Sequence, residues 1–372
     1  MASSIWEHFS VVSDPRLDRT KLHKLEDILA ITICAVICTC DTWNEIEDFG
    51  EAHKDWFETF LELPNGIPSH DTFGRVLAAL NPEDFERCFQ AWVTDLAGSS
   101  EGKLIAIDGK ALRRSVDRAS GKAAVYLVSA WVQENHAVFG QVAVDDKSNE
   151  ITAIPKLLEM LQLKNATVTI DAIGCQKDIA QKIIDRKGHY VLAVKGNQGT
   201  LHDDVKAFLD DAVQRDFKGL PHDLFEQTEK GHGRIETRRT WCTDKIGWLT
   251  DRHHWAGLCS VAVMDCQRKI GDQSSVERRY FISSLPARTA QRIAMAVRKH
   301  WRVENELHWS LDVCFNEDQS RARIKNAAEN LSRVRRIALT LLRQDTSDTA
   351  SLRRKRLRAS WDQNYLLKVL RI

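Results

Sequence analysis

The spacing of apolar side chains changes along the chain, and each spacing predicts a different kind of element. In residues 1–98, apolar positions recur every three to four residues, from Leu22 through ITICAVIC and again in TWNEIEDFGEAHKDWFETFLEL. That period predicts amphipathic helices. Residues 64–66 (PNG) interrupt it, and Ser69 is placed to cap a helix in TFGRVLAALNPEDFERCFQAWV. Two short helices around a turn fit either a helix-turn-helix or an ordinary helical bundle.

After Lys103 the apolar runs become short and β-branched. LIAID, AAVYLVSAWV and AVFGQVAVDD predict three strands, the last two joined as a hairpin near residues 134–136. ITAIPKLLEML then predicts a helix, ATVTIDAI a strand, QKDIAQKIIDRK a helix and HYVLAVKGN a strand. Three antiparallel strands followed by alternating helices and strands match the ribonuclease H-like order, in which the first and fourth strands are neighbours.

Residues from about 200 to 288 interrupt this alternation. They contain strand-like pieces, including RIETRRTWCT, HWAGLCSVAVMD and ERRYFISSL, joined by polar connections. We interpret them as a mainly β insertion ahead of the last core helix, which should begin near Thr289 and carry Glu304. The predicted fold class is therefore α/β: a ribonuclease H-like core with a mainly β insertion before the last catalytic helix, preceded by an all-helical N-terminal domain.

Length and charge divide the chain further. At 372 residues it exceeds the size at which a single core stops growing, so we expect several domains. They are a helical N-terminal domain at 1–98, a ribonuclease H-like domain at 99–345 and a basic helical tail at 346–372. The formal net charge is only +1, but fourteen Lys/Arg stand against four Asp/Glu from Gln319 to Ile372. Such a stretch can neutralise DNA phosphates, or it can be a solvated helix face.

Cysteine usage and hydropathy indicate the compartment. The nine cysteines are odd in number and form no CxxC pair, which favours reduced thiols in a cytoplasmic protein over disulfides or a zinc site. The apolar run from Ile28 to Cys38 is too short to cross a bilayer, so no membrane partner is expected.

Three acidic residues stand at the ends of differently built apolar segments: Asp108 in LIAIDGK, Asp171 in ATVTIDAIG and Glu304 in RKHWRVENELHWSLD. Phosphodiester cleavage without a covalent intermediate can use two Mg²⁺ ions about 3.5–4 Å apart. Mg²⁺ prefers carboxylate oxygens and keeps part of its shell for water and substrate phosphate. Carboxylates from three separate elements therefore predict a divalent-metal nucleic-acid enzyme.

Residues around Glu304 support this prediction. His300, Glu304 and His308 recur every four residues, with Trp301 three before the Glu, so a regular helix would place them on one face. Such a face could bind metal and phosphate and stack a base. Alternatively it is a core face on which Glu304 pairs with Arg298 or Arg302. His308 is a candidate for supporting a metal ligand without binding the ion itself, as is Glu150, an acidic residue at the start of a predicted helix.

Two loops carry candidate DNA contacts. In residues 195–198 (KGNQ), Lys195 and Asn197 follow a predicted strand, and in residues 230–239 basic side chains flank glycines. We expect His232, Arg234 and Arg238 to contact a DNA backbone, although a solvated basic hairpin is the ordinary alternative. The sequence has no Walker pattern, no GxSxG and no Rossmann fingerprint after a strand.

Taken together, these residues resemble the Asp-Asp-Glu transposases of bacterial insertion sequences, and specifically their H-repeat-associated family. The resemblance runs nearly end to end through SDPR, WNEIEDFG, GIPSHDTF, IAIDGK, KSNEITAIP, TIDAIGCQKDIA, VKGNQG, HGRIETR, HWRVENELHWSLDV and NEDQSR. It implies that Asp108, Asp171 and Glu304 are the catalytic, metal-binding triad for two Mg²⁺ or Mn²⁺ ions. It also implies DNA cleavage at the element's ends and strand transfer into target DNA.

The resemblance further implies partners: double-stranded DNA, as terminal inverted repeats and target, and a second copy of the chain, because both ends must be held at once. The superfamily also spaces a Tyr, an Arg and a Lys around the Glu, but Ala296, His300 and Leu311 occupy those positions here. That departure leaves hairpin-based end processing open and makes Arg298, His300 and Trp301 the expected phosphate and base contacts. The alternatives are a ribonuclease H-like nuclease that does not join ends and a catalytically silent DNA-binding relic.

Overall fold

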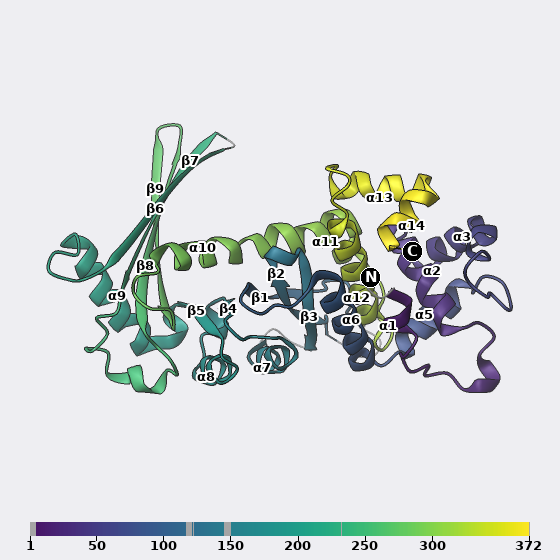
Figure 1. Cartoon of the computed structure of the whole chain (residues 1–372), viewed down its shortest axis with the longest axis horizontal. Coiled ribbons are helices and arrows are strands. Elements are labelled where there is room, and N and C mark those ends of the chain that lie inside the picture. Colours follow the sequence, from purple (N-terminus) through teal and green to yellow (C-terminus); the bar gives the residue numbers. More distant parts are fainter. Residues whose placement is uncertain (1–4, 117–120, 122, 145–149, 232, 372) are drawn as a thin grey trace. The chain divides into compact units, whose positions relative to one another are not determined.

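A computed structural model describes residues 5–116, 121, 123–144, 150–231 and 233–371. The chain divides into two compact units (Figure 1). The first unit contains residues 1–99, 109–149 and 304–372; the second contains residues 100–108 and 150–303. Strand β1 (Leu104–Ala111) is shared, since its first five residues belong to the second unit and its last three to the first.

The first unit is mainly helical. Its N-terminal helices are α1 (Ile5–Phe9), α2 (Leu25–Ile37), α3 (Trp43–Ala52), α4 (Lys54–Phe57), α5 (His70–Ala79) and α6 (Pro82–Ala97). Its C-terminal helices are α11 (Trp309–Phe315), α12 (Ala327–Gln344), α13 (Leu352–Trp361) and α14 (Gln363–Leu370). Helix α2 is buried on almost every side, as expected of a helix that is apolar all round. Helix α12 packs against α2, α5, α6 and strand β3, so the two ends of the chain build one core.

Local sequence explains where several of these helices begin. Thr42 and Glu45 form a capping box at the start of α3. Asn81 accepts hydrogen bonds from the Glu83 and Asp84 amides, at 2.8 and 3.1 Å, at the start of α6. Ser69 does stand at the N-cap position of α5, but its hydroxyl contacts the Thr72 hydroxyl rather than a backbone amide.

Strands β2 (Tyr126–Val132) and β3 (Ala137–Val144) form the predicted antiparallel hairpin of this unit, with His136 in the left-handed region at φ 49°. The end of β1 lies beside β2. A Cβ atom added at Gly109 would stand 2.4 Å from the Tyr126 ring, so only glycine fits directly after Asp108.

The second unit is a sheet with helices on both faces. Its remaining elements are α7 (Glu150–Met160), β4 (Thr167–Ile170), α8 (Lys177–Asp185), β5 (His189–Val194), α9 (Gly199–Gln214), β6 (Asp223–Gly231), β7 (Arg234–Thr243), β8 (Ser260–Ile270), β9 (Gln273–Ser283) and α10 (Ala290–His300). Strands β1, β4 and β5 are parallel, and β9 joins β5 antiparallel. Through the shared strand β1, the hydrogen-bonded order is β3-β2-β1-β4-β5-β9-β8-β7-β6.

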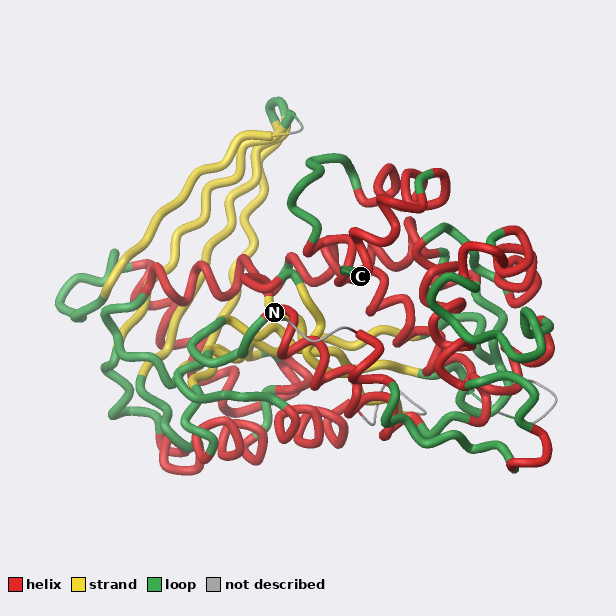
Figure 2. The backbone as a smooth tube through the Cα atoms, turned by 45° about the vertical axis from the view of Figure 1, so that its right-hand side comes forward, coloured by secondary structure: helices red, strands yellow, loops and turns green. Residues whose placement is uncertain are grey.

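The segment at 200–288 contains the predicted strand pieces, which lie in β7, β8 and β9, but it also contains helix α9. The prediction missed this helix, although Leu201, Val205, Leu209 and Ala212 recur at helical spacing and are buried. Strands β6–β9 continue the core sheet through β5, and their distal ends extend away from the helices of this unit (Figure 2).

Helix α10 begins at Ala290, one residue from the predicted start, but Glu304 does not lie in regular α-helix. It opens a π-helical turn, η7 (Glu304–His308), that leads into α11. A π turn changes the angular spacing of side chains, so the regular helix expected from His300 to His308 is interrupted at Glu304. Glu304 and His308 nevertheless share a face, as predicted, since their side chains meet at 3.2 Å. Such turns occur frequently at functional sites.

Candidate active site

The strand register brings Asp108 and Asp171 to the same level of the sheet. Strands β1 and β4 are parallel neighbours, with Ala106 paired to Thr169 and Ile107 to Ile170. Asp108 is the next residue of β1, and Asp171 directly follows the last residue of β4. Neighbouring strands lie about 4.7–4.9 Å apart, so the two half-buried carboxylates leave the sheet side by side, at the point where the pairing of β1 with β4 ends.

Both carboxylates are on the face of the sheet that α10 covers. The last residue of α10, His300, places its Nδ1 3.1 Å from Thr169 Oγ1, and Arg292 donates to Thr167 Oγ1 at 2.8 Å. Because side chains alternate along a strand, Asp171 points to the same face as Thr169. His300 therefore lies two positions along the strand from Asp171, on the same side.

The chain directly after Asp171 is held by several contacts. Asp171 Oδ1 accepts a hydrogen bond from the Ile173 amide at 3.0 Å and so caps the short 3₁₀ turn η4 (Ala172–Gly174). Asn197 donates to the Ala172 carbonyl at 2.7 Å and Gln198 to the Cys175 carbonyl at 2.6 Å. Asn197, a predicted DNA contact, therefore ties the loop at residues 195–198 to the turn after Asp171. Lys195, the first residue of this loop, is exposed at the end of β5.

Glu150 is the first residue of α7 and only 2% exposed. Helix α7 packs against the turn η4 that Asp171 caps. Burial of a carboxylate requires polar partners, and the supporting role of Glu150 behind a metal ligand stays a prediction.

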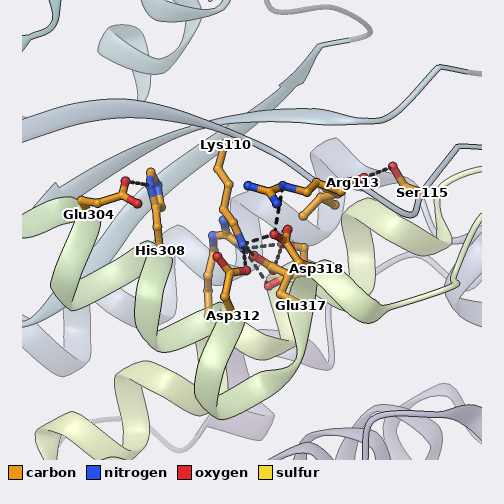
Figure 3. A network of polar contacts seen from close by, with 11 residues as sticks. Lys110, Arg113, Ser115, Glu304, His308, Asp312, Glu317 and Asp318 are labelled. Atoms are coloured by element: carbon orange, nitrogen blue, oxygen red, sulfur yellow. Dashed lines mark hydrogen bonds and ion pairs between the residues drawn. The ribbon is translucent and has the colours of Figure 1, made fainter.

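Glu304 belongs to the first unit and contacts the other predicted residue of its turn. His308 Nδ1 lies 3.2 Å from Glu304 Oε2 (Figure 3). The side chain of Glu304 is 70% exposed, whereas that of His308 is 4% exposed. The hydrogen bond with His308 lowers the pKa of Glu304 below its ordinary value, so Glu304 is held as a carboxylate.

The arginines predicted to contact DNA are paired with carboxylates. Arg298 and Arg238 both reach Glu229 Oε2, at 3.1 and 2.8 Å, and Arg238 also contacts Glu236. Arg234 lies 3.4 Å from Glu236. A DNA phosphate would therefore share each guanidinium with its carboxylate or displace that carboxylate. His232 lies outside the described residues.

Trp301 follows α10 directly and is 51% exposed. The Arg279 guanidinium stands 4.4 Å from the centroid of the Trp301 ring, within the range of a cation–π contact. An exposed indole beside a cation is a platform on which a nucleic-acid base can stack.

The basic surplus of the C-terminal region is partly internal. Arg333, Arg335 and Arg336 of α12 are at most 2% exposed, and Arg356 of α13 is 3% exposed. Arg333 pairs with the buried Glu86 at 2.6 Å, and Arg356 donates to the Val36 carbonyl at 2.7 Å. These arginines join the helices of the first unit. The charge count therefore overstated the basic surface available to phosphates, because it carries no information on burial.

The sequence interpretation missed one residue of interest, Lys110, which lies two residues beyond Asp108. It is buried among three acidic side chains (Figure 3). A lysine directly after an Asp-Gly pair could have suggested such a partner set, but the acids follow about two hundred residues later in the chain.

Similarity to known proteins establishes the family to which the chain belongs. The "Transposase DDE domain" family matches residues 99–341, and the associated N-terminal family matches residues 6–93. The chain belongs to the DDE transposase family. "H repeat-associated putative transposase YhhI" of Escherichia coli strain K12 is 44% identical over 98% of this chain and 97% of its own length. "Putative transposase YncI" of Escherichia coli O157:H7 is 43% identical over 99% of this chain and 94% of its own length.

A solved piggyBac transposase synaptic complex with hairpin DNA aligns with 98% of this chain and 80% of its own, at 11% identity and a TM-score of 0.42. That similarity is too weak to support an argument. Within the part of the chain that the structure describes, none of the helices combines the length and apolarity that a membrane span requires.

Proposed function

We propose that the chain cleaves DNA at the ends of its own element and joins the freed 3′-hydroxyl to target DNA. The observation that carries the proposal is the placement of Asp108 and Asp171 side by side, directly after the last paired residues of the parallel strands β1 and β4. Membership of the DDE transposase family supports the same reaction class. The order β3-β2-β1-β4-β5, with β2 and β3 antiparallel and β1, β4 and β5 parallel, supports a ribonuclease H-like core.

The two aspartates, together with Glu304, have the donor chemistry of a divalent-metal site. Asp108 and Asp171 offer hard carboxylate oxygens at half-buried positions, and Glu304, with its lowered pKa, offers a third. We assign Asp108, Asp171 and Glu304 as the ligands of Mg²⁺ or Mn²⁺, with two ions in the working site. When bound, such ions supply Lewis acidity toward the attacking oxygen and the scissile phosphate.

The remaining candidate residues act on the DNA. We propose that Lys195, which is exposed at the end of β5, contacts a backbone phosphate close to Asp171. Trp301 provides an apolar face for an unpaired base at the cleaved end. Asn197 orients the loop that carries Lys195, and His300 supports the strand that carries Asp171. The helical N-terminal region contributes recognition of the element's ends, and two copies of the chain hold the two ends.

The test uses DNA carrying the inverted repeats that flank the element, with Mg²⁺ and products mapped at nucleotide resolution. The expected result is cleavage at the repeat boundary and joining to target DNA, both lost in Glu304→Ala. Cleavage of pre-nicked ends without joining would instead make the chain a nuclease on the same fold. Binding without metal-dependent cleavage would identify a DNA-binding relic and overturn the catalytic assignment.

A further inference from the structure

Lys110 is the centre of a buried ion-pair network in the first unit. Its side chain is 9% exposed, and its Nζ contacts Asp312, Glu317 and Asp318 (Figure 3). The contact with Glu317 Oε2 measures 3.0 Å and that with Asp318 Oδ1 3.6 Å. One ammonium therefore joins strand β1 to both α11 and the following 3₁₀ turn η8 (Glu317–Gln319).

The network is anchored to the core helix α12. Glu317 is 1% exposed, accepts a hydrogen bond from Ser332 at 2.6 Å and pairs with Arg336 at 3.1 Å. Burial alone would raise the pKa of Glu317, but the charges of Arg336 and Lys110 outweigh it and lower the pKa to about 2. The ion pairs are therefore formed throughout the neutral range. Lys110 is therefore held by a buried acid that is itself tied to helix α12 through Ser332 and Arg336.

The network joins two segments, and each of them directly follows a proposed metal ligand: the end of β1 follows Asp108, and α11 follows the Glu304 turn. Lys110 is two residues beyond Asp108 on β1, so the two side chains are on the same face of the strand. Asp312 lies in the helix that continues from the Glu304 turn. Any shift of Lys110 relative to Asp312 moves the end of β1 against α11, the helix that follows the Glu304 turn.

We infer that Lys110 is a positioning residue for the metal site: it fixes the segment that follows Asp108 against the helix that follows Glu304. This inference rests on the proposed function, because it assumes that both carboxylates bind the same ions. Outer partners that orient the ligands of a metal site typically contribute about 10–100-fold in metal affinity.

A positioning role and a simple charge effect predict opposite results. The ammonium group is positive, and its charge also contributes, after the His308 hydrogen bond, to the lowered pKa of Glu304. If charge alone mattered, removing Lys110 would strengthen divalent-cation binding, because repulsion would be relieved. If Lys110 positions the ligands, its removal weakens binding despite that relief.

The experiment measures Mn²⁺ binding to the full-length chain by electron paramagnetic resonance of the free ion, without DNA. We expect Lys110→Met to raise the Kd for Mn²⁺ about tenfold or more. The matched control is Arg113→Met, which removes the same charge from an 80% exposed side chain that contacts Asp318 at 3.2 Å; its Kd should stay at the wild-type value. Unchanged or tighter binding in Lys110→Met overturns the inference.

Two further measurements separate this result from loss of folding and from failure of the proposed function. Asp312→Asn removes a partner whose side chain is 31% exposed, so it disturbs the core less, and it should also raise the Kd. If Lys110→Met does not fold, as judged by circular dichroism, an unchanged Kd in Asp312→Asn overturns the inference. A wild-type chain that binds no Mn²⁺ overturns the proposed metal site and this inference together, whereas binding that ignores both substitutions overturns only the inference.

Discussion

Asp108 and Asp171 directly follow Ile107 and Ile170, which are register partners on the parallel strands β1 and β4. The two carboxylates are 63 positions apart in the chain but leave the sheet as neighbours. This relationship is the structural basis of the assignment of the catalytic centre, and the first prediction tests it.

Replacement of either aspartate by asparagine should abolish metal-dependent cleavage while leaving the fold intact. Asparagine keeps the size of the side chain but removes the charge that a divalent ion requires. Loss of several kcal/mol of transition-state stabilisation corresponds to a rate reduction of roughly 10³-fold or more. The measurement is the rate of end cleavage in Mg²⁺ for Asp108→Asn and Asp171→Asn.

The control for both variants is Asp178→Asn, which neutralises an exposed acid in the first turn of α8. Its rate should equal that of the wild type. Cleavage at the wild-type rate in Asp108→Asn or Asp171→Asn would remove that residue from the proposed site.

Trp301→Ala should weaken binding of DNA with an unpaired end more than binding of fully paired DNA. Stacking of a base on an aromatic ring contributes about 1–3 kcal/mol, which corresponds to roughly 5–150-fold in Kd. Trp361→Ala, which truncates a 78% exposed Trp, is the matched control and should change neither Kd. Equal losses with both kinds of DNA would argue against stacking at Trp301.

Arg333→Met should destabilise the first unit, because it leaves Glu86 buried without its guanidinium partner. Both side chains are at most 2% exposed, and breaking such a pair typically costs about 3–5 kcal/mol. Urea unfolding followed by tryptophan fluorescence measures the change. The double variant Arg333→Met with Glu86→Gln should recover part of the loss, since it removes the buried charge.

In contrast, Arg354→Met, at an exposed position of α13, should leave the free energy of unfolding within about 0.5 kcal/mol of the wild type. If Arg333 contacted phosphates instead of Glu86, its replacement would lower the salt dependence of DNA binding without affecting unfolding. That pattern would contradict the buried pair.

Glu317 should make the protein sensitive to acid. Its folded pKa is about 2, below the ordinary value of 4.5, so the folded state binds a proton less readily than the unfolded state. The stabilisation is therefore fully present above about pH 4.5 and is lost as the pH falls toward 2. The difference corresponds to a contribution on the order of 3 kcal/mol.

The measurement compares urea unfolding of the wild type and Glu317→Gln at pH 6, pH 4.5 and pH 3. The variant should be less stable at pH 6, and the gap between the two proteins should narrow toward pH 3. A gap of constant size would show that Glu317 is not the source of the pH dependence.

The periodic segments of the sequence predicted much of the second unit. Strands β1, β4 and β5 and helices α7 and α8 lie where the apolar runs placed them, because each is a short buried element with a clear period. The neighbouring placement of Asp108 and Asp171 follows from this strand order. Helix α9 was not predicted, although its buried apolar residues recur at helical spacing, because strand-like segments follow it in the sequence.

Other features depend on contacts that no local pattern records. The π turn at Glu304 changes the hydrogen-bond register within a helix, which apolar spacing alone does not reveal. Lys110 meets Asp312 and Glu317 across more than two hundred residues, and Arg333 meets Glu86 across 247. The sequence does not show whether a charged side chain is solvated or buried. The net charge of the C-terminal region therefore included arginines that lie in the core.

The first unit is built from both ends of the chain, so a shortened copy of the gene loses part of its core. Its N-terminal helices α2, α5 and α6 pack against α12, and Arg356 of α13 reaches back to the end of α2. A premature stop after residue 303 would therefore remove Glu304, a proposed metal ligand, and would also expose the apolar core of the N-terminal helices. We expect the shortened product to be unfolded and degraded, so it could not persist as a stable competitor for the element's ends.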